Sequence, residues 1–290
     1  VVTMYLWKNH RTVVIGQNQN PYSECNVKLL CSEGGYVMRR TTGGGAVYHD
    51  DGNINFSFIA PPGLYDQKRQ FSVLQRAVGF YGLNTELSGR NDVLCEGRKF
   101  SGNAFSKGRY QNLHHGTVLI KGNMDDLQRY LRVKPAKLQK HGVKSVSSRV
   151  INLSEAVPEL TSENIKEPLI RSFGKIYGGA PAILNFEALS QNEEVQATAK
   201  RISSFDFLFA RWEHFKTTKR AQFDWGAVEI SLHINEAEKT IDDIQIASDC
   251  LDTEIIAQAE RLLKDCSTHN TPEFDASNAM LKDIVRLIYG

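Results

Sequence analysis

A run of three glycines behind two arginines and two threonines constrains this chain more than any other stretch. It reads "RRTTGGGAVYHDDGNINFSF", residues 39–58. Glycine has no side chain, so its backbone approaches a ligand closely and adopts positive φ without steric cost. Arginine binds phosphate or carboxylate oxygens through paired hydrogen bonds. The stretch predicts either a cradle for an anionic ligand or a bulged turn with solvated arginines, and spacing alone does not separate these two interpretations.

The end of this stretch alternates between polar and apolar side chains. Asn53, Asn55 and Ser57 are separated by apolar residues, the first of which is Ile54. A period of two is typical of a strand with one buried face. We therefore expect a strand to leave the glycine loop.

A helix and a hairpin follow that strand. The helix is expected from Asp66 to a stop at Gly82, because its apolar residues recur at helical spacing. The run "NDVLCEGRKFSGNAF" predicts two short strands that turn at Glu96 and Gly97. This hairpin carries Lys99. A lysine on a hairpin is usually a solvated charge, but in a closed site it can neutralise charge on a phosphate or acyl oxygen.

The rest of the chain predicts two domains. "TMYLWKNHRTVVIG" is typical of strand, turn and strand, "HHGTVLI" of a further strand, and residues 162–177 of a helix. After a linker near "RWEHFKTTKR", alternating runs around Ile230 and Ile244 precede helices from about Thr253 and Asn278. Strands followed by helices indicate a small α+β module. We expect domains at 1–212 and 222–290.

Composition limits the function classes. The hydrophobic share of 41%, the charged share of 23% and the absence of an apolar run near the ~20 residues of a membrane span predict a soluble protein. A net charge of +2 without charge blocks gives no sign of nucleic-acid binding. Five cysteines without Cys-x-x-Cys spacing favour a reducing compartment. Neither the Rossmann nor the phosphate-loop glycine pattern is present.

Four motifs in order make the chain recognisable: "RRTTGGGAVYHDDGNINFSF", "GRNDVLCEGRKFSGNAF", "HHGTVLI" and "VSSRVINL". Together they resemble the lipoate–protein ligases, and similar framing segments, "YLWKNHRTVVIGQNQNPYSECN" and "FDWGAVEISLHI", extend the resemblance over nearly the full chain. The ordered set is specific in a way that no single motif is.

The resemblance implies an α/β (α+β) fold: a mixed-sheet catalytic domain of the biotin-ligase and class II synthetase-like type, followed by a small accessory domain. It also implies the activity. Members of the family activate lipoate with ATP and Mg²⁺ to lipoyl-adenylate, then pass the acyl group to one lysine of an acceptor. Acceptors include the lipoyl domains of 2-oxoacid dehydrogenase E2 subunits and the glycine-cleavage H protein. The expected compartment is the bacterial cytoplasm, or else an organelle matrix.

The resemblance further implies roles for individual residues. Lys99 matches the family lysine that contacts the carboxyl oxygen and the α-phosphate, and Asp92 matches a position near the adenylate and Mg²⁺. The residues expected along lipoate are Trp7, Arg40, Gly44, Gly45, Val47 and His115. Those expected at ATP or the adenylate are Arg40, Gly45, Asn53, Asp92, Lys99, Gly102 and Ala104.

Two features depart from the family pattern. After "SGNAF" the chain has "SKGRYQN", where many relatives carry an earlier arginine, so Lys107 and Arg109 are the substitutes that could cover the adenylate. The family's opening strand and helix are missing before Val1, and we expect the sequence to begin inside a domain.

Two other functions stay open at this point. One is acyl transfer from a preformed activated donor without ATP, in which a cysteine such as Cys95 forms a thioester, although a structural role fits its strand-like neighbours better. The other is a non-catalytic binding module that retains the fold. The intact cationic residues weigh against the second.

Overall fold

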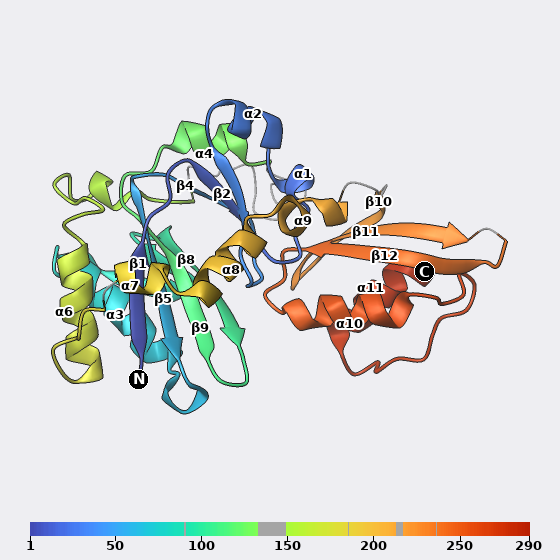
Figure 1. Ribbon diagram of the computed structural model, residues 1–290. Helices are drawn as coiled ribbons and strands as arrows, with labels where there is room; N and C mark the ends of the chain where they lie inside the picture. The colour runs from blue at the N-terminus through green and yellow to red at the C-terminus, as the bar shows by residue number, and fades with distance from the viewer. Residues whose placement is uncertain (90, 133–148, 185, 213–216, 236) are drawn as a thin grey trace.

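The computed structural model describes residues 1–89, 91–132, 149–184, 186–212, 217–235 and 237–290. Figure 1 shows a larger body that holds the N-terminus and a smaller one that holds the C-terminus. The larger body contains two sheets, and the smaller contains one.

The six-stranded sheet has the order β1-β5-β9-β8-β7-β6, and every neighbouring pair is antiparallel. Its strands are β1 (Thr3–Trp7), β5 (Asn53–Ala60), β6 (Thr85–Ser88), β7 (Asp92–Cys95), β8 (Arg98–Lys107) and β9 (Asn112–Leu119). Helices α3 (Gln67–Gly79) and α6 (Lys166–Tyr177) pack on one of its faces and share a continuous apolar core with it (Figure 1). The other face is therefore free of these two helices.

The second sheet of the larger body mixes strand directions. Its central strand β2 (Thr12–Ile15) runs parallel to β3 (Tyr36–Arg39) and antiparallel to β4 (Val47–His49). The glycine loop is the connection between β3 and β4. The expected strand from Asn53 does not leave this loop directly, because β4 and a turn intervene.

Within the described ranges, short helices complete the larger body. They are α1 (Pro21–Glu24), α2 (Val27–Ser32), α4 (Met124–Tyr130), α7 (Phe186–Ser190), α8 (Glu193–Ile202) and α9 (Phe205–Leu208), with 3-10 turns at Pro62–Leu64, Leu153–Glu155 and Ala210–Trp212. None of the helices in the described ranges is long and apolar enough to cross a lipid bilayer.

The strand β5 is buried more completely than its alternation predicts. Ile54 is fully buried in the helix-covered core, as expected. Asn53 and Asn55, expected to be exposed, are only 2% and 1% exposed. Alternation of polarity therefore marked the two faces correctly, but both faces are covered, and the polar one lies inside the protein.

Local signals place the two long helices. Asp66 caps α3 by accepting a hydrogen bond from the Arg69 backbone amide at 3.1 Å. Gly82 adopts a φ of +75° in the turn beyond the helix. The helix α6 begins at Lys166, four residues later than expected, and Pro168 lies in its first turn, where a missing N–H breaks no helical bond.

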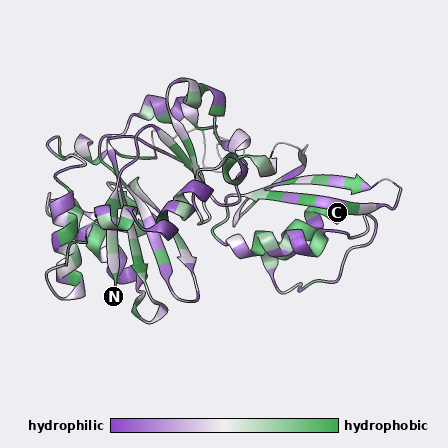
Figure 2. Cartoon of the chain, viewed as in Figure 1, coloured by the Kyte–Doolittle hydropathy of each residue, from purple (hydrophilic) through white to green (hydrophobic). Residues whose placement is uncertain are grey.

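The smaller body confirms the predicted α+β module. Strands β10 (Thr217–Phe223), β11 (Gly226–Asn235) and β12 (Thr240–Ser248) form an antiparallel sheet, packed against α10 (Thr253–Leu263) and α11 (Ala279–Tyr289). Hydrophobic and hydrophilic residues alternate along β11 and β12 (Figure 2). The strand β10 was not predicted, and its first residues occupy part of the expected linker, whose residues 213–216 lie outside the described ranges. The boundary at 212 and 222 stays a prediction.

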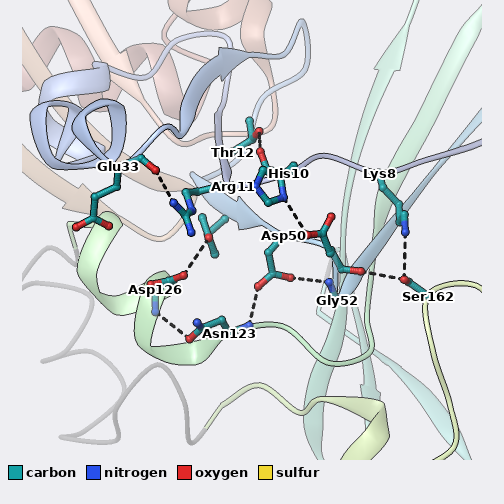
Figure 3. Close-up of polar contacts among 12 residues, drawn as sticks. Lys8, His10, Arg11, Thr12, Glu33, Asp50, Gly52, Asn123, Asp126 and Ser162 are labelled. Atoms are coloured by element: carbon teal, nitrogen blue, oxygen red, sulfur yellow. Dashed lines mark hydrogen bonds and ion pairs between the residues drawn. The ribbon is translucent and has the colours of Figure 1, made fainter.

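The turn between β4 and β5 is held by a carboxylate (Figure 3). Asp50 accepts hydrogen bonds from the backbone amides of Gly52 at 2.9 Å and Asn123 at 2.7 Å. A Cβ on Gly52 would lie 1.9 Å from the Lys121 carbonyl oxygen, so the turn packs directly on the end of β9. This fixes the point at which β5 enters the sheet.

The smaller body docks on the glycine loop. The Gly44 amide donates to the Cys250 carbonyl at 3.0 Å, and the Ser248 amide donates to the Asn18 carbonyl at 2.9 Å. A Cβ on Gly43 would lie 2.2 Å from the Cys250 oxygen. The absence of a side chain at Gly43 therefore permits a backbone-to-backbone contact between the two bodies.

We expect Gly43→Ala to destabilise this docking, because the new methyl group meets backbone atoms that cannot rotate away. A loss of about 1–3 kcal/mol in the free energy of unfolding is typical of such overpacking, and urea unfolding measures it. Gly79→Ala is the matched control, since a Cβ there meets no atom within 4 Å. Equal stability of the two variants would contradict the contact.

Candidate active site

A β-bulge decides the direction of the Lys99 side chain. Along β7 and β8, Val93 pairs with Ser101, but the next pair is Leu94 with Lys99, so Phe100 has no partner across the ladder. An unbroken register would set Lys99 opposite Cys95, whose side chain lies in the core. Because side chains alternate between faces, skipping one residue moves Lys99 to the opposite face.

On that face Lys99 meets a carboxylate. Its Nζ lies 2.7 Å from Asp92 Oδ1, and the two side chains are 36% and 34% exposed. Gly102 leaves room for the lysine, since a Cβ there would lie 2.9 Å from both Lys99 Cε and Nζ. The Lys99 backbone is held by Arg149 and Ile151 through hydrogen bonds of 2.9 Å, which links the hairpin to the described part of the "VSSRVINL" motif.

Strand register brings most predicted site residues onto this one face. Across neighbouring strands, Trp7 is opposite Asn55, Asn55 is opposite Thr117, and His115 is opposite Ala104. Side chains at every second position share a face. The predicted residues on the face of the Lys99–Asp92 pair are therefore Trp7, Asn53, Asp92, Lys99, Gly102, Ala104 and His115.

The glycine loop and β4 lie against the same face. Thr42 Oγ1 and His115 Nε2 share a hydrogen bond at 2.6 Å. The rings of Trp7 and His49 are 6.1 Å apart and meet edge to face. The glycine loop and Lys99 thus belong to one side of the six-stranded sheet, and Val47 of β4 precedes His49 by two positions.

Arg40 braces the glycine loop in this structure. Its guanidinium donates to the carbonyl oxygens of Gly43 and Gly45 at 2.8 Å and of Val14 at 3.2 Å. Burial lowers the pKa of Arg40 to about 10. The sequence interpretation of solvated arginines is wrong for this residue, and its binding of a carboxylate or phosphate stays a prediction.

Arg39 is also structural. Only 7% exposed, it donates to the backbone carbonyls of Gly16, Gln17 and Gln19, and to that of Leu208 at 2.7 Å. The arginine pair therefore ties the glycine loop to β2 on one side and to α9 on the other.

The glycines serve close approaches of the protein's own backbone. Gly44 has a φ of +96°, which favours glycine, and its carbonyl oxygen would lie 2.2 Å from a Cβ on Gly16. Its amide is engaged by Cys250. The roles of Gly44 and Gly45 along a ligand stay predictions.

Two histidines of this face are uncharged near neutral pH. Burial and the neighbouring Arg40 lower the pKa of His49 to about 3 and that of His115 to about 4. The sequence analysis gave neither His49 nor Thr42 a role in the site. The position of His49 on the same strand as Val47 was the signal that could have found it.

The described residues contain no group of three or more His, Cys, Asp or Glu side chains that could hold a metal by themselves. Asp92 nonetheless offers the oxygen ligand that Mg²⁺ prefers. Mg²⁺ commonly takes one or two carboxylates together with substrate phosphates and water. Asp92 therefore fits a metal that arrives with a nucleotide.

Cys95 is not placed as a nucleophile. It is 1% exposed in the helix-covered core, and burial raises the pKa of its thiol. Its side chain lies on the opposite face from Lys99. A thiolate route through Cys95 therefore has no geometric support.

A cavity of about 1600 Å³ lies elsewhere, beside β1 and α6. Its lining includes Tyr5, Leu64, Phe173 and Ile183. Lys107, which the sequence suggested as a cover for the adenylate, also lines this cavity, but Lys99, Asp92 and the glycine loop do not. The motifs therefore define a site separate from this cavity.

Comparison with known proteins assigns the family. The lipoyl protein ligase A/B catalytic domain matches residues 2–174, and the bacterial lipoate protein ligase C-terminus matches residues 213–278. Lipoate-protein ligase A of Psychrobacter cryohalolentis is 34% identical over 91% of this chain and 79% of its own length. That of Bdellovibrio bacteriovorus is 35% identical over 90% and 78%. The chain belongs to the lipoate–protein ligase family.

Solved structures agree with this assignment. The lipoate complex of LipL1 from P. falciparum has a TM-score of 0.82 and 29% identity, covering 98% of this chain and 86% of that one. A ligase from the lipoylation system of Thermoplasma acidophilum has a TM-score of 0.59 and 25% identity, covering 73% and 83%. The predicted family, enzyme class and two-part fold are confirmed.

We expect the buried histidines to make stability depend on pH. The pKa of His115 is about 4 in the folded protein, against an ordinary 6.5, so the unfolded chain binds more protons between these values. Stability therefore falls as pH drops from 6.5 toward 4, by up to about 1.4 kcal/mol per pH unit for each such histidine. Urea unfolding at several pH values between 6.5 and 4.5 measures this dependence. In His115→Gln the free energy of unfolding should fall less steeply as the pH drops, and an unchanged pH dependence would refute the burial of this ring.

Proposed function

We propose that this protein joins lipoate to a lysine of acceptor lipoyl domains in two steps that consume ATP. The observation that carries the proposal is the Lys99–Asp92 pair on the sheet face that also holds Trp7, His115 and the glycine loop. Membership of the lipoate–protein ligase family supports the reaction class. A lipoate-protein ligase A solved with ATP shares the fold.

In the first step, a lipoate carboxylate oxygen attacks the α-phosphorus of ATP and pyrophosphate leaves. Negative charge gathers on the carboxyl and α-phosphate oxygens. The ammonium of Lys99 is suited to neutralise that charge, because a positioned cation stabilises the transition state more than the ground state. Asp92 holds the lysine in place and supplies an oxygen for Mg²⁺, which would polarise the phosphates when bound.

In the second step, the acceptor lysine amine attacks the acyl carbon of lipoyl-adenylate. An amide bond forms, AMP leaves, and the amine loses a proton. Water competes with the amine for the same carbon, so the intermediate must be shielded. Trp7 and Val47 supply the apolar surface that suits the lipoyl tail, while Arg40, Gly44 and Gly45 line the approach to the head group.

The natural acceptors we propose are E2 lipoyl domains of 2-oxoacid dehydrogenases and the glycine-cleavage H protein. In the archaeal lipoylation system of Thermoplasma acidophilum, the bi-partite ligase is paired with an E2 lipoyl domain of the same organism. The bacterial origin of the Psychrobacter and Bdellovibrio relatives favours the bacterial cytoplasm over an organelle matrix.

The deciding experiment combines purified protein with ATP, Mg²⁺, lipoate and an apo lipoyl domain. Mass spectrometry should show a gain of one lipoyl group that depends on ATP. Lipoylation from a preformed adenylate or an acyl-carrier donor, with none from ATP, would favour the transferase instead. Binding of lipoate without pyrophosphate release would favour a non-catalytic module.

We expect Lys99→Ala to abolish adenylation without unfolding the protein. The loss of one charge-stabilising group typically costs about 100-fold or more in rate, whereas a partly exposed side chain contributes little to packing. Pyrophosphate release and circular dichroism measure the two effects. Lys200→Ala, on the exposed surface of α8, is the matched control. A soluble Lys99→Ala variant with full activity would remove Lys99 from the mechanism.

Gly102→Ala tests the path of the lysine. The new Cβ would lie 2.9 Å from Lys99 Cε and Nζ, which are the flexible end of that side chain. We expect the lysine to move and the free energy of unfolding to change by less than about 1 kcal/mol. Adenylation should fall by about 10-fold or more, because catalysis depends on positions held to within an ångström. A large loss of stability with normal turnover would contradict this reasoning.

A further inference from the structure

A chain of buried polar side chains crosses the core directly behind the site. His114, on the helix-covered face of β9, is fully buried. Its Nε2 lies 2.9 Å from Asn103 Oδ1, and its Nδ1 lies 2.9 Å from the Gln70 side chain of α3. The ring thus connects a helix to the strand that carries Lys99.

The hydrogen bonds of Asn103 fix which nitrogen of His114 carries the proton. Asn103 Nδ2 donates to the Asn91 carbonyl at 3.0 Å and to Ser101 Oγ at 3.2 Å. Its Oδ1 is therefore an acceptor that faces His114. Burial lowers the pKa of His114 to about 3, so the ring is neutral and has one N–H to donate. That N–H is at Nε2.

The other nitrogen must then accept, which orients Gln70. A neutral Nδ1 needs a donor. The Gln70 amide nitrogen and the Tyr177 hydroxyl are both buried, and the Gln70 side chain lies within hydrogen-bonding reach of that hydroxyl. Rotating the Gln70 side-chain amide by a half turn exchanges its oxygen and nitrogen. Its NH₂ then donates to His114 Nδ1, and its oxygen accepts from the Tyr177 hydroxyl. Each of the three links, Tyr177–Gln70, Gln70–His114 and His114–Asn103, then joins a donor to an acceptor.

The far end of this chain is the residue before Asp92. The Asn103 backbone N–H also donates to the Asn91 carbonyl, at 2.9 Å, and Asn91 Nδ2 donates to the Asn103 backbone carbonyl at 2.9 Å. These bonds hold the point where β7 begins, one residue from the carboxylate that meets Lys99. Gly116 gives Asn103 its room, since a Cβ there would lie 2.7 Å from Asn103 Oδ1.

We propose that His114 is a positioning residue for the Lys99–Asp92 pair. By donating from Nε2 it orients Asn103, which clamps Asn91 and thereby sets the Asp92 carboxylate against the lysine. This inference rests on the proposed function of that pair. His114 itself touches neither reacting atoms nor substrate.

A packing role alone makes a different prediction. The His114 ring also contacts aromatic side chains, with Phe105 at 4.7 Å and Phe71 at 4.9 Å between ring centroids. If packing were its whole role, another flat ring would replace it. If the donor matters, a side chain with an N–H in the same place is the better substitute.

The experiment compares His114→Phe, which keeps a ring, with His114→Gln, whose amide reaches the place of Nε2. We expect His114→Phe to lower kcat for lipoyl-adenylate formation by about 10-fold or more, as is usual when a supporting hydrogen bond is lost. His114→Gln should retain most of the rate, and KM for lipoate should change in neither. Equal rates in the two variants, or a better rate for His114→Phe, would overturn the proposal.

Two structural measurements test whether His114 positions the Lys99–Asp92 pair, even where a variant folds poorly or the wild type forms no adenylate. Long-range ¹H–¹⁵N spectra of the wild-type protein should show His114 neutral and protonated at Nε2; protonation at Nδ1 would overturn the proposal. Crystal structures should show the Lys99–Asp92 contact retained in His114→Gln. Loss of that contact would also overturn it. Inactive wild-type protein with both readouts as expected would reject the proposed reaction and leave the positioning of the pair standing.

Discussion

One unpaired residue in β8 determines which side of the sheet Lys99 occupies. The sheet separates an apolar interior, covered by α3 and α6, from a polar face, covered by the glycine loop and β4. Without Phe100 as an extra residue, strand alternation would direct Lys99 into the interior, where an unpaired ammonium is costly. The bulge directs it toward Asp92, and the proposed chemistry depends on that pairing.

The glycine loop shows how one motif combines folding and function. Its arginines are satisfied by backbone carbonyls, and Gly43 and Gly44 let the C-terminal module approach within hydrogen-bonding distance. A ligand that lies against this loop therefore lies close to the contact between the two bodies. The loop is held by hydrogen bonds, because several backbone carbonyls accept from the guanidinium groups of Arg39 and Arg40.

Much of the fold could be predicted because its signals are local. Asp66 caps α3, the turn at Glu96 and Gly97 forms the hairpin, and periodicity marks β5 and β11. The features that the sequence did not predict depend on residues far away in the chain. Asn53 and Asn55 look exposed in sequence, because nothing nearby reveals that the chain returns to cover them. The strand β10 was missed because its polar, basic sequence becomes a strand only by pairing with β11.

The sequence by itself determined the family and the two-part architecture, and it predicted a set of site residues, because ordered motifs and periodic patterns are properties of the chain itself. Tertiary structure alone decided how those residues meet. The register of the bulge places Lys99 with Asp92, the loop carbonyls engage Arg40, and the core orients His114. Each of these contacts depends on how separate segments of the chain pair in three dimensions, and local sequence composition does not predict such pairing.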